Sequence, residues 1–200
     1  MKEIAIIAFD QFTDIDLFLM WDILGRNRQD WRVRILGNAS TLRSAHGLEI
    51  TPQGALCEAS QADAVLFCSG KEGVPLALAD SSFLPSINLD SSRQYIGSIC
   101  AGAFILNALG LLPKRQASTH PEAMAVLKTL SVEPVNQPLV CDGHVATAGG
   151  CLSALYLVGW LIESLFDKQK RDATLQPVLP TGQQQLFNSL IEFSVHQGRM

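Results

Sequence analysis

The stretch QYIGSICAGAFILNALGLL, residues 94–112, contains two hydrophobic patterns in immediate succession. Its first part, residues 95–100, has the short apolar run of a buried strand. From residue 103 to 112 the apolar residues recur at the spacing of a helix. The chain must therefore turn from strand to helix directly at Cys100, and such a turn holds a side chain at the end of a sheet.

The same alternation of strand and helix patterns runs through the rest of the chain. Strands are predicted at residues 3–9, 31–37, 64–68, 139–141 and 144–148, and helices at 14–25, 121–130 and 151–166. Asp142-Gly143 is typical of a hairpin turn, and residues 42–52 predict a further hairpin or a small excursion. These patterns predict an α/β fold, a doubly wound parallel sheet sandwiched by helices.

The composition is that of a chain with one substantial core. It has 200 residues, of which 48% are hydrophobic and 17% charged, and no linker or repeat divides it. We expect a single domain over residues 1–200, with 168–200 as a C-terminal helical extension. That extension combines a polar, proline-containing link with a final helix at 183–196, which carries on one face Leu186, Phe187, Leu190 and Phe193.

The charge and the cysteines of the sequence indicate which kinds of binding partner and which cellular compartment to expect. The net charge is −4 and the lysines and arginines are mostly scattered, so we expect no nucleic-acid partner. No segment approaches the roughly 18 apolar residues of a membrane span. The first apolar run is short and ends at Asp10, which favours the first strand of a cytoplasmic protein over a signal peptide. Five cysteines without metal-ligand spacing predict reduced thiols, no metal site and no cofactor.

Cys100 lies at the sheet edge where α/β proteins bind ligands. A thiol on this turn faces the N-terminus of the following helix, which predicts a lowered thiol pKa. The same geometry offers the backbone N–H groups of Ala101 and Gly70 to a developing oxyanion. The alternative is that Cys100 is one more small buried hydrophobic residue.

Several segments resemble the ThiJ/PfpI superfamily, which has a flavodoxin-like, class-I glutamine amidotransferase-like fold. IGSICAGAFILNALGLL is similar to its cysteine signature, and DIDLFLMWDIL to its acidic segment, which implies that Asp16 lies beside the thiol. ADAVLFCSG is similar to the turn that implies an oxyanion or substrate-binding role for Gly70 and Ser69. ASTHPEAM implies that His120 is the active-site histidine, and HVATAGG matches a late strand and turn. The likeness covers about residues 3–165.

Within the superfamily the chain resembles the branch of isonitrile hydratases and of the N-terminal domains of AraC-type regulators, with three departures. Residues 68–70 replace the superfamily's Pro-Gly-Gly, and residues 19–21 replace its Gly-Pro. Ala101 stands where the isonitrile hydratase branch has threonine. The chain is also expected to lack the DNA-binding domain that AraC-type relatives append.

Each candidate residue has a structural alternative. A carboxyl group beside a thiolate would have a raised pKa and act as general acid or base, whereas Asp16 as a structural residue would cap a helix or bond the backbone. His120 is either a proton shuttle or substrate ligand, or a residue at a helix start. Thr119 is expected to form a capping box with Glu122. Cys68 or Cys151 is either a resolving thiol for Cys100 or ordinary packing.

Two classes of function remain open. One is an enzyme in which the Cys100 thiolate adds to a small electrophilic substrate, as a hydratase, amidase or glyoxalase-like protein would. The other is a non-catalytic redox sensor, or a small-ligand-binding regulatory protein, that uses oxidation of Cys100. The strongly apolar residues 18–21 of the first helix favour a homodimer contact in either case.

Overall fold

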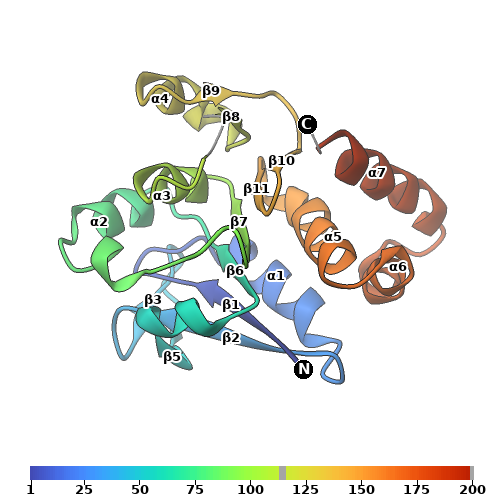
Figure 1. Cartoon of the computed structure of the whole chain (residues 1–200), viewed down its shortest axis with the longest axis horizontal. Helices are drawn as coiled ribbons and strands as arrows, with labels where there is room; N and C mark the ends of the chain where they lie inside the picture. Colours follow the sequence, from blue (N-terminus) through green and yellow to red (C-terminus); the bar gives the residue numbers. More distant parts are fainter. Residues whose placement is uncertain (113–115, 199–200) are drawn as a thin grey trace.

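The computed structural model describes residues 1–112 and 116–198 and confirms the α/β fold (Figure 1). Its main sheet has seven strands in the order β10-β11-β7-β6-β1-β2-β5. All neighbours pair in parallel except β10 and β11, which form the predicted hairpin. The strands are β1 (Lys2–Ile7), β2 (Trp31–Gly37), β5 (Gly54–Ala55), β6 (Ala64–Phe67), β7 (Tyr95–Ile99), β10 (Leu139–Asp142) and β11 (Val145–Ala148).

The described residues also form two small two-stranded sheets. Residues 42–52 form a hairpin of β3 (Leu42–Arg43) with β4 (Glu49–Ile50), as one of the two predictions for this segment stated. The parallel pair of β8 (Gln116–Ala117) and β9 (Glu133–Pro134) was not predicted. Strands of two residues, like the edge strand β5, are too short to show an alternating hydrophobic pattern.

Helices cover both faces of the main sheet (Figure 1). Helices α1 and α5 pack together on one face, and α2 and α3 lie on the other. The α-helices are α1 (Asp14–Gly25), α2 (Gly73–Ala79), α3 (Gly102–Ala108), α4 (Met124–Thr129), α5 (Ala154–Leu165), α6 (Lys168–Leu175) and α7 (Gln184–Gln197). Short 3-10 turns are η1 (Leu56–Gln61), η2 (Leu84–Ser86), η3 (Pro121–Ala123), η4 (Cys151–Ser153) and η5 (Gln176–Val178).

Burial on both faces of the sheet explains why the central strands have continuous apolar sequences. All four residues of β6 and of β11, and the last four of β1, are buried because both faces of these strands are covered. The carboxyl ends of β1, β6 and β7 lie side by side in the sheet. This places the three loops with candidate site residues at one edge.

Three predicted helices have different boundaries in the structure. The one expected at 121–130 consists of the 3-10 turn η3 followed by α4. The helix expected at 103–112 ends at Ala108, because Gly110 adopts φ +70°, a conformation in which a helix cannot continue. The helix expected from residue 151 begins as the 3-10 turn η4, and the α-helix follows from Ala154.

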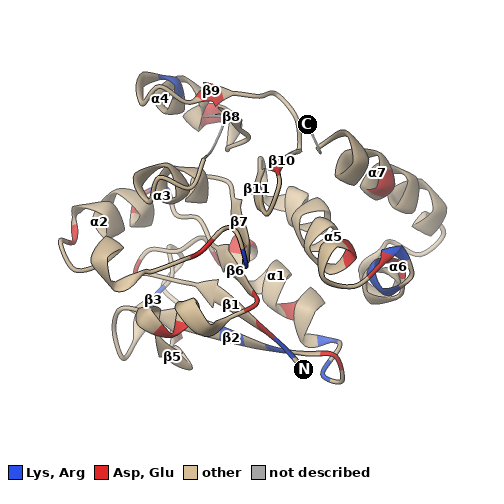
Figure 2. Ribbon diagram, viewed as in Figure 1, with Lys and Arg blue, Asp and Glu red and all other residues tan. Residues whose placement is uncertain are grey.

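The C-terminal extension is more structured than its polar sequence predicts. Helix α6 forms within the expected link and buries Arg171, which is 0% exposed and pairs with Glu163 of α5. Helix α6 carries three basic residues, Lys168, Lys170 and Arg171, and one acidic residue, Asp172 (Figure 2). Helix α7 packs through Ile191 and Val195, whereas three apolar residues of the face noted in the sequence are exposed: Leu186, Leu190 and Phe193.

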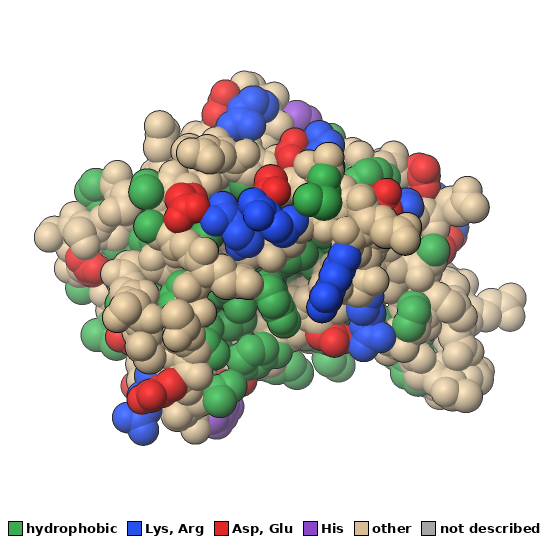
Figure 3. Space-filling model, turned by 90° about the horizontal axis from the view of Figure 1, so that it is seen from below, with side chains coloured by type: hydrophobic (Ala, Val, Ile, Leu, Met, Phe, Trp, Pro, Cys, Tyr) green, Lys and Arg blue, Asp and Glu red, His purple; other side chains and the backbone are tan. Residues whose placement is uncertain are grey.

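The surface fits the expected charge distribution. On the face seen in Figure 3, basic side chains have acidic ones beside them. None of the helices in the described part of the chain has the length and apolar character needed to cross a membrane. Helix α1 packs against α5 and α6 within the chain.

Candidate active site

Cys100 occupies the predicted turn between β7 and α3. Its backbone has φ +49°, an uncommon value for a residue with a side chain. The Cys100 N–H donates to the carbonyl oxygen of Ala148 at 2.8 Å, which extends the pairing with β11. Gly102 allows α3 to start at once, because a Cβ there would lie 2.8 Å from the carbonyl oxygen of Cys68. The strand thus ends in a strained residue whose thiol is held at the sheet edge.

Asp16 reaches the same point from the first turn of α1. Its N–H donates to the carbonyl oxygen of Thr13, and its side chain is only 1% exposed. The Asp16 Oδ1 atom lies 3.8 Å from Cys100 Sγ, within reach of the thiol proton. The other oxygen, Oδ2, is buried and makes no hydrogen bond within the described residues. The carboxyl group therefore has one oxygen at the thiol and one buried oxygen without a hydrogen-bond partner among the described residues.

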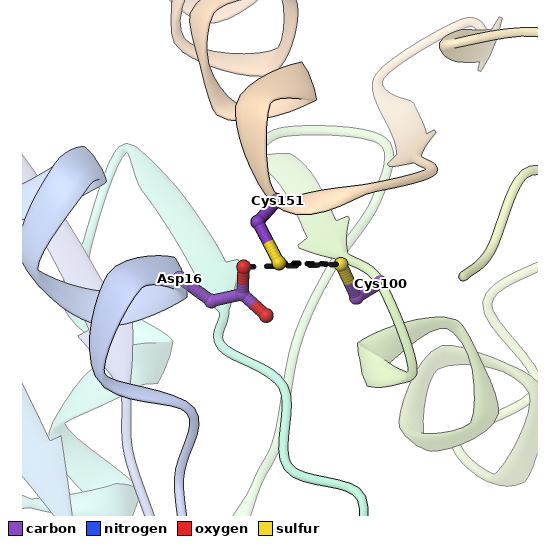
Figure 4. A group of neighbouring side chains, drawn as sticks. All are labelled: Asp16, Cys100 and Cys151. Carbon is purple, nitrogen blue, oxygen red and sulfur yellow. Dashed lines mark hydrogen bonds between the residues drawn. The ribbon is translucent and has the colours of Figure 1, made fainter. Parts of the chain in front are cut away.

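A second thiol completes the cluster (Figure 4). Cys151, at the start of η4, places its Sγ 3.9 Å from Cys100 Sγ. The three side chains point toward one another from α1, from the end of β7 and from η4. Cys151 is half-buried, so it is the most accessible member.

Burial controls protonation in this cluster. It raises the pKa of Asp16, although the Cys151 and Cys100 thiols and the Ser69 hydroxyl oppose the effect. Burial, together with the Asp16 carboxylate, also raises the pKa of Cys100. The expectation of a lowered thiol pKa is therefore wrong. Helix α3 is only seven residues long, and its terminus does not offset the neighbouring carboxylate.

The predicted oxyanion residues lie beside the cluster. The Ala101 N–H donates to Ser69 Oγ at 3.1 Å, so this amide already has a partner. Ser69 in turn holds the loop before α1, because its carbonyl oxygen accepts from the Thr13 N–H at 2.7 Å. Gly70 permits the close approach of that loop, since a Cβ would collide with the carbonyl oxygen of Gln11. The oxyanion roles of Ala101, Ser69 and Gly70 stay predictions.

Thr119 has a role that the sequence did not show. Its hydroxyl donates to the carbonyl oxygen of Cys100 at 2.9 Å, and the side chain is buried. The predicted capping box of Thr119 with Glu122 is therefore wrong. His120 caps η3 instead, because its Nδ1 accepts from the Glu122 N–H at 3.3 Å. His120 is half-buried next to Thr119, and a positive charge on it lowers the pKa of Asp16.

The cluster also contains the atoms of a possible metal site. The ligand atoms of Asp16, Cys100 and Cys151 lie within 4.8 Å of one another. The prediction of no metal rested on sequence spacing, which did not reveal this grouping. Burial raises the pKa of all three groups, which disfavours the deprotonated thiols that a metal ion would need.

Comparison with known proteins shows the family of the chain. The sequence profile of the DJ-1/PfpI family matches residues 2–164. The chain belongs to the DJ-1/PfpI family. This DJ-1/PfpI protein is 28% identical to an isonitrile hydratase of Pseudomonas putida over 155 residues, which are 76% of this chain and 67% of that protein.

Two further DJ-1/PfpI comparisons bear on fold and length. The chain is 30% identical over 132 residues to the HTH-type transcriptional regulator GlxA of Rhizobium meliloti, and the match covers 65% of this chain but 41% of the regulator. A THiJ/PfpI family protein from Pseudomonas syringae has the same fold, with a TM-score of 0.79 and 20% identity. That match covers 98% of this chain and 88% of the other.

Proposed function

We propose that this protein is a cysteine-dependent enzyme that adds water to, or hydrolyses, a small electrophilic substrate. The observation that carries the proposal is the 3.8 Å approach of Asp16 Oδ1 to the thiol of Cys100 in its strained turn. The similarity to an isonitrile hydratase makes isonitriles the first substrate class to test. Amides and α-oxoaldehydes are the other classes that the same chemistry accommodates.

The raised pKa of Cys100 determines how the thiol would react. Because a free thiolate is unfavourable in this buried site, the thiol loses its proton to Asp16 as the carbon–sulfur bond forms. Asp16 then returns the proton to the anion that develops on the substrate. The Ser69 hydroxyl, which accepts from the Ala101 N–H, has its own proton to donate to that anion.

A water molecule releases the product from Cys100 in the last step of the proposed reaction. The unpartnered Oδ2 of Asp16 is suited to hold a water molecule beside the adduct. Attack of that water on the adduct carbon, followed by cleavage of the carbon–sulfur bond, regenerates the thiol and releases the hydrated product. We propose His120 as a proton shuttle to solvent, because it is half-buried and its charge influences Asp16.

The partner and the location follow from this chemistry. A small molecule is the proposed partner, and a cytoplasmic location would keep the five thiols reduced. We propose a homodimer as well, supported by the exposed Ile15 on α1 (45%) beside the half-buried Phe18 and Leu19. Light scattering gives the mass in solution, and a monomer at all concentrations would contradict the dimer.

The test is an assay with a small alkyl isonitrile, an amide and an α-oxoaldehyde, followed by NMR. We expect one substrate class to be converted, with turnover abolished in Cys100→Ala and reduced about 100-fold or more in Asp16→Asn. Cys57→Ser, on the exposed turn η1, is the matched control and should retain full activity. Turnover that survives in Cys100→Ala would overturn the proposal, and so would conversion of none of the three classes.

A further inference from the structure

Cys151 is a nucleophilic group that the proposed catalysis does not use. Its Sγ lies 3.9 Å from Cys100 Sγ, although 51 positions separate the two residues in the chain. The sulfurs are in van der Waals contact, and a disulfide requires them to approach by a further ~2 Å. Whether this pair can bond depends on which of the two residues is free to move.

Cys100 is the fixed member of the pair. Its N–H is bound to Ala148, and its carbonyl oxygen accepts from Thr119. Cys151 has more freedom, because it starts a 3-10 turn and follows Gly150, which has φ +86°. Apart from its two chain neighbours, no atom of the described residues lies within 4 Å of the position that a Cβ on Gly150 would occupy. A change in the backbone at Gly150 can therefore carry Cys151 toward Cys100.

Cys68, the other thiol at this edge, is a weaker partner. It directly follows β6, is completely buried, and burial raises its pKa far above the ordinary value for a thiol. Cys57 and Cys141 lie outside the cluster of Asp16, Cys100 and Cys151. The geometry therefore selects Cys151 among the two candidates that the sequence offered.

We propose that Cys100 and Cys151 form a reversible intramolecular disulfide when the protein meets a peroxide. Cys100 passes its proton to Asp16, and its sulfur attacks one peroxide oxygen, which breaks the O–O bond. Cys100 becomes a sulfenic acid, and the other oxygen leaves as water or an alcohol after taking up a proton. The Cys151 sulfur then attacks the Cys100 sulfur, the S–O bond breaks, and a molecule of water leaves with the Cys151 proton.

The disulfide has two consequences for the molecule. It removes the Cys100 thiol, so the proposed catalysis stops until a dithiol reductant restores both cysteines. It also competes with the further oxidation of Cys100 to the irreversible sulfinic and sulfonic acids. The order of oxidation rests on Cys100 as the nucleophile of the proposed function, whereas the bond between the two sulfurs does not require any enzymatic activity.

Peptide mapping after treatment with hydrogen peroxide and blocking of free thiols tests the proposal. Cleavage by trypsin together with cleavage before aspartate separates all five cysteines, because Asp63 lies between Cys57 and Cys68, and Asp142 between Cys141 and Cys151. We expect the peptides 94–114 and 142–166 to be joined, with the loss of two hydrogens, and two of the five thiols to be lost. A dithiol should restore both.

Substitution of single cysteines distinguishes the proposed disulfide from the alternatives. In Cys151→Ser we expect Cys100 to gain two or three oxygens instead, whereas Cys68→Ser and Cys57→Ser should form the same disulfide as the wild type. Equal over-oxidation of Cys100 in wild type and Cys151→Ser would overturn the proposal, as would a bond from Cys100 to Cys68. A protein that forms the disulfide but converts no substrate would contradict the proposed function alone.

Discussion

The sulfur of Cys100 lies 3.8 Å from Oδ1 of Asp16, although 84 positions separate the two residues. Both side chains are almost completely buried. The contact is therefore a proton-sharing pair in a medium that disfavours charge on either member.

The first prediction concerns the reactivity of Cys100 toward iodoacetamide. Asp16→Asn removes the negative charge that raises the thiol pKa but retains the burial. We expect the pKa of Cys100 to be lower in Asp16→Asn than in the wild type, and still above about 8.5. Near neutral pH the variant should therefore be alkylated faster than the wild type, because a larger fraction of the Cys100 thiol is ionised. Mass spectrometry of peptide 94–114 from neutral to alkaline pH measures both effects, and identical profiles would exclude coupling.

The second prediction concerns stability and pH. Burial raises the pKa of Asp16, so the folded state holds this proton more tightly than the unfolded state. That contribution to stability is fully present below the unfolded pKa and is lost as the pH rises through the folded pKa. At neutral pH, Asp16→Asn should therefore increase the free energy of unfolding, by about 1–3 kcal/mol. Urea denaturation at several pH values should show this gain shrinking in acid.

Asp14→Asn is the matched control with the opposite sign. Burial of Asp14 acts to raise its pKa, but hydrogen bonds from Ser44 and His46 outweigh it and lower the pKa. This stabilisation is present above the unfolded pKa and is lost as the pH falls through the folded pKa. The variant should lose about 1 kcal/mol or less near neutral pH and nothing in acid. The same sign for both variants would refute the assignment of Asp16 as the destabilised carboxylate.

The third prediction concerns Thr119. Thr119→Val retains the shape of the side chain but removes the hydroxyl that donates to the Cys100 carbonyl oxygen. We expect a loss of about 1 kcal/mol in the free energy of unfolding. The alkylation profile of Cys100 should also move toward that of Asp16→Asn, because the strained turn is less firmly held. Thr129→Val, which removes an exposed hydroxyl bonded to Val126, should change neither quantity.

The fourth prediction concerns the start of α3. A Cβ at Gly102 would lie 2.8 Å from the Cys68 carbonyl oxygen and 3.1 Å from that of Phe67. Gly102→Ala should therefore force α3 away from β6 and cost about 1–3 kcal/mol of unfolding free energy. Gly25→Ala is the control, because nothing lies within 4 Å of its Cβ position, and it should be neutral or slightly stabilising. Thermal denaturation measures the melting temperatures of both variants. Equal melting temperatures would contradict the close packing at Gly102.

The fifth prediction concerns the C-terminal extension. Arg171→Met withdraws the cation from Glu163 and Asp172, with which the buried guanidinium pairs. We expect a loss of about 3–5 kcal/mol in the free energy of unfolding. Arg26→Met removes an exposed i,i+4 pair with Asp22 and should cost less than about 1 kcal/mol. If both variants lost the same amount, the buried pair would not be what joins α6 to α5.

Local patterns were sufficient for six of the seven strands of the main sheet and for the position of Cys100 at the end of one of them. The helix at residues 14–25 and the strand at 31–37 have the boundaries that were predicted. Gly143, with φ +58°, confirms the turn that Asp142-Gly143 indicates. Helix α6 was missed because its polar sequence has little hydrophobic periodicity, and its buried face depends on an ion pair with α5.

The candidate site also combines residues that local patterns suggested with residues that only long-range contacts bring together. The turn at Cys100 and the likeness to known motifs suggested Asp16 and Cys100 together, and the structure places them in contact. Cys151 was one of two alternatives, since nothing local distinguishes it from Cys68 as a partner. Thr119 was assigned to a cap, because its bond to Cys100 joins residues that are not close in the sequence.

Sequence alone determined the longer strands and the more apolar helices, because hydrophobic periodicity and turn residues act over a few neighbouring positions. It determined that a thiol ends a central strand and that an acid follows the first strand. Only the tertiary structure decided which second thiol meets Cys100, which hydroxyl holds the turn, and in which direction the thiol pKa moves. Those outcomes depend on burial and on distances between segments far apart in the chain, which no local pattern specifies.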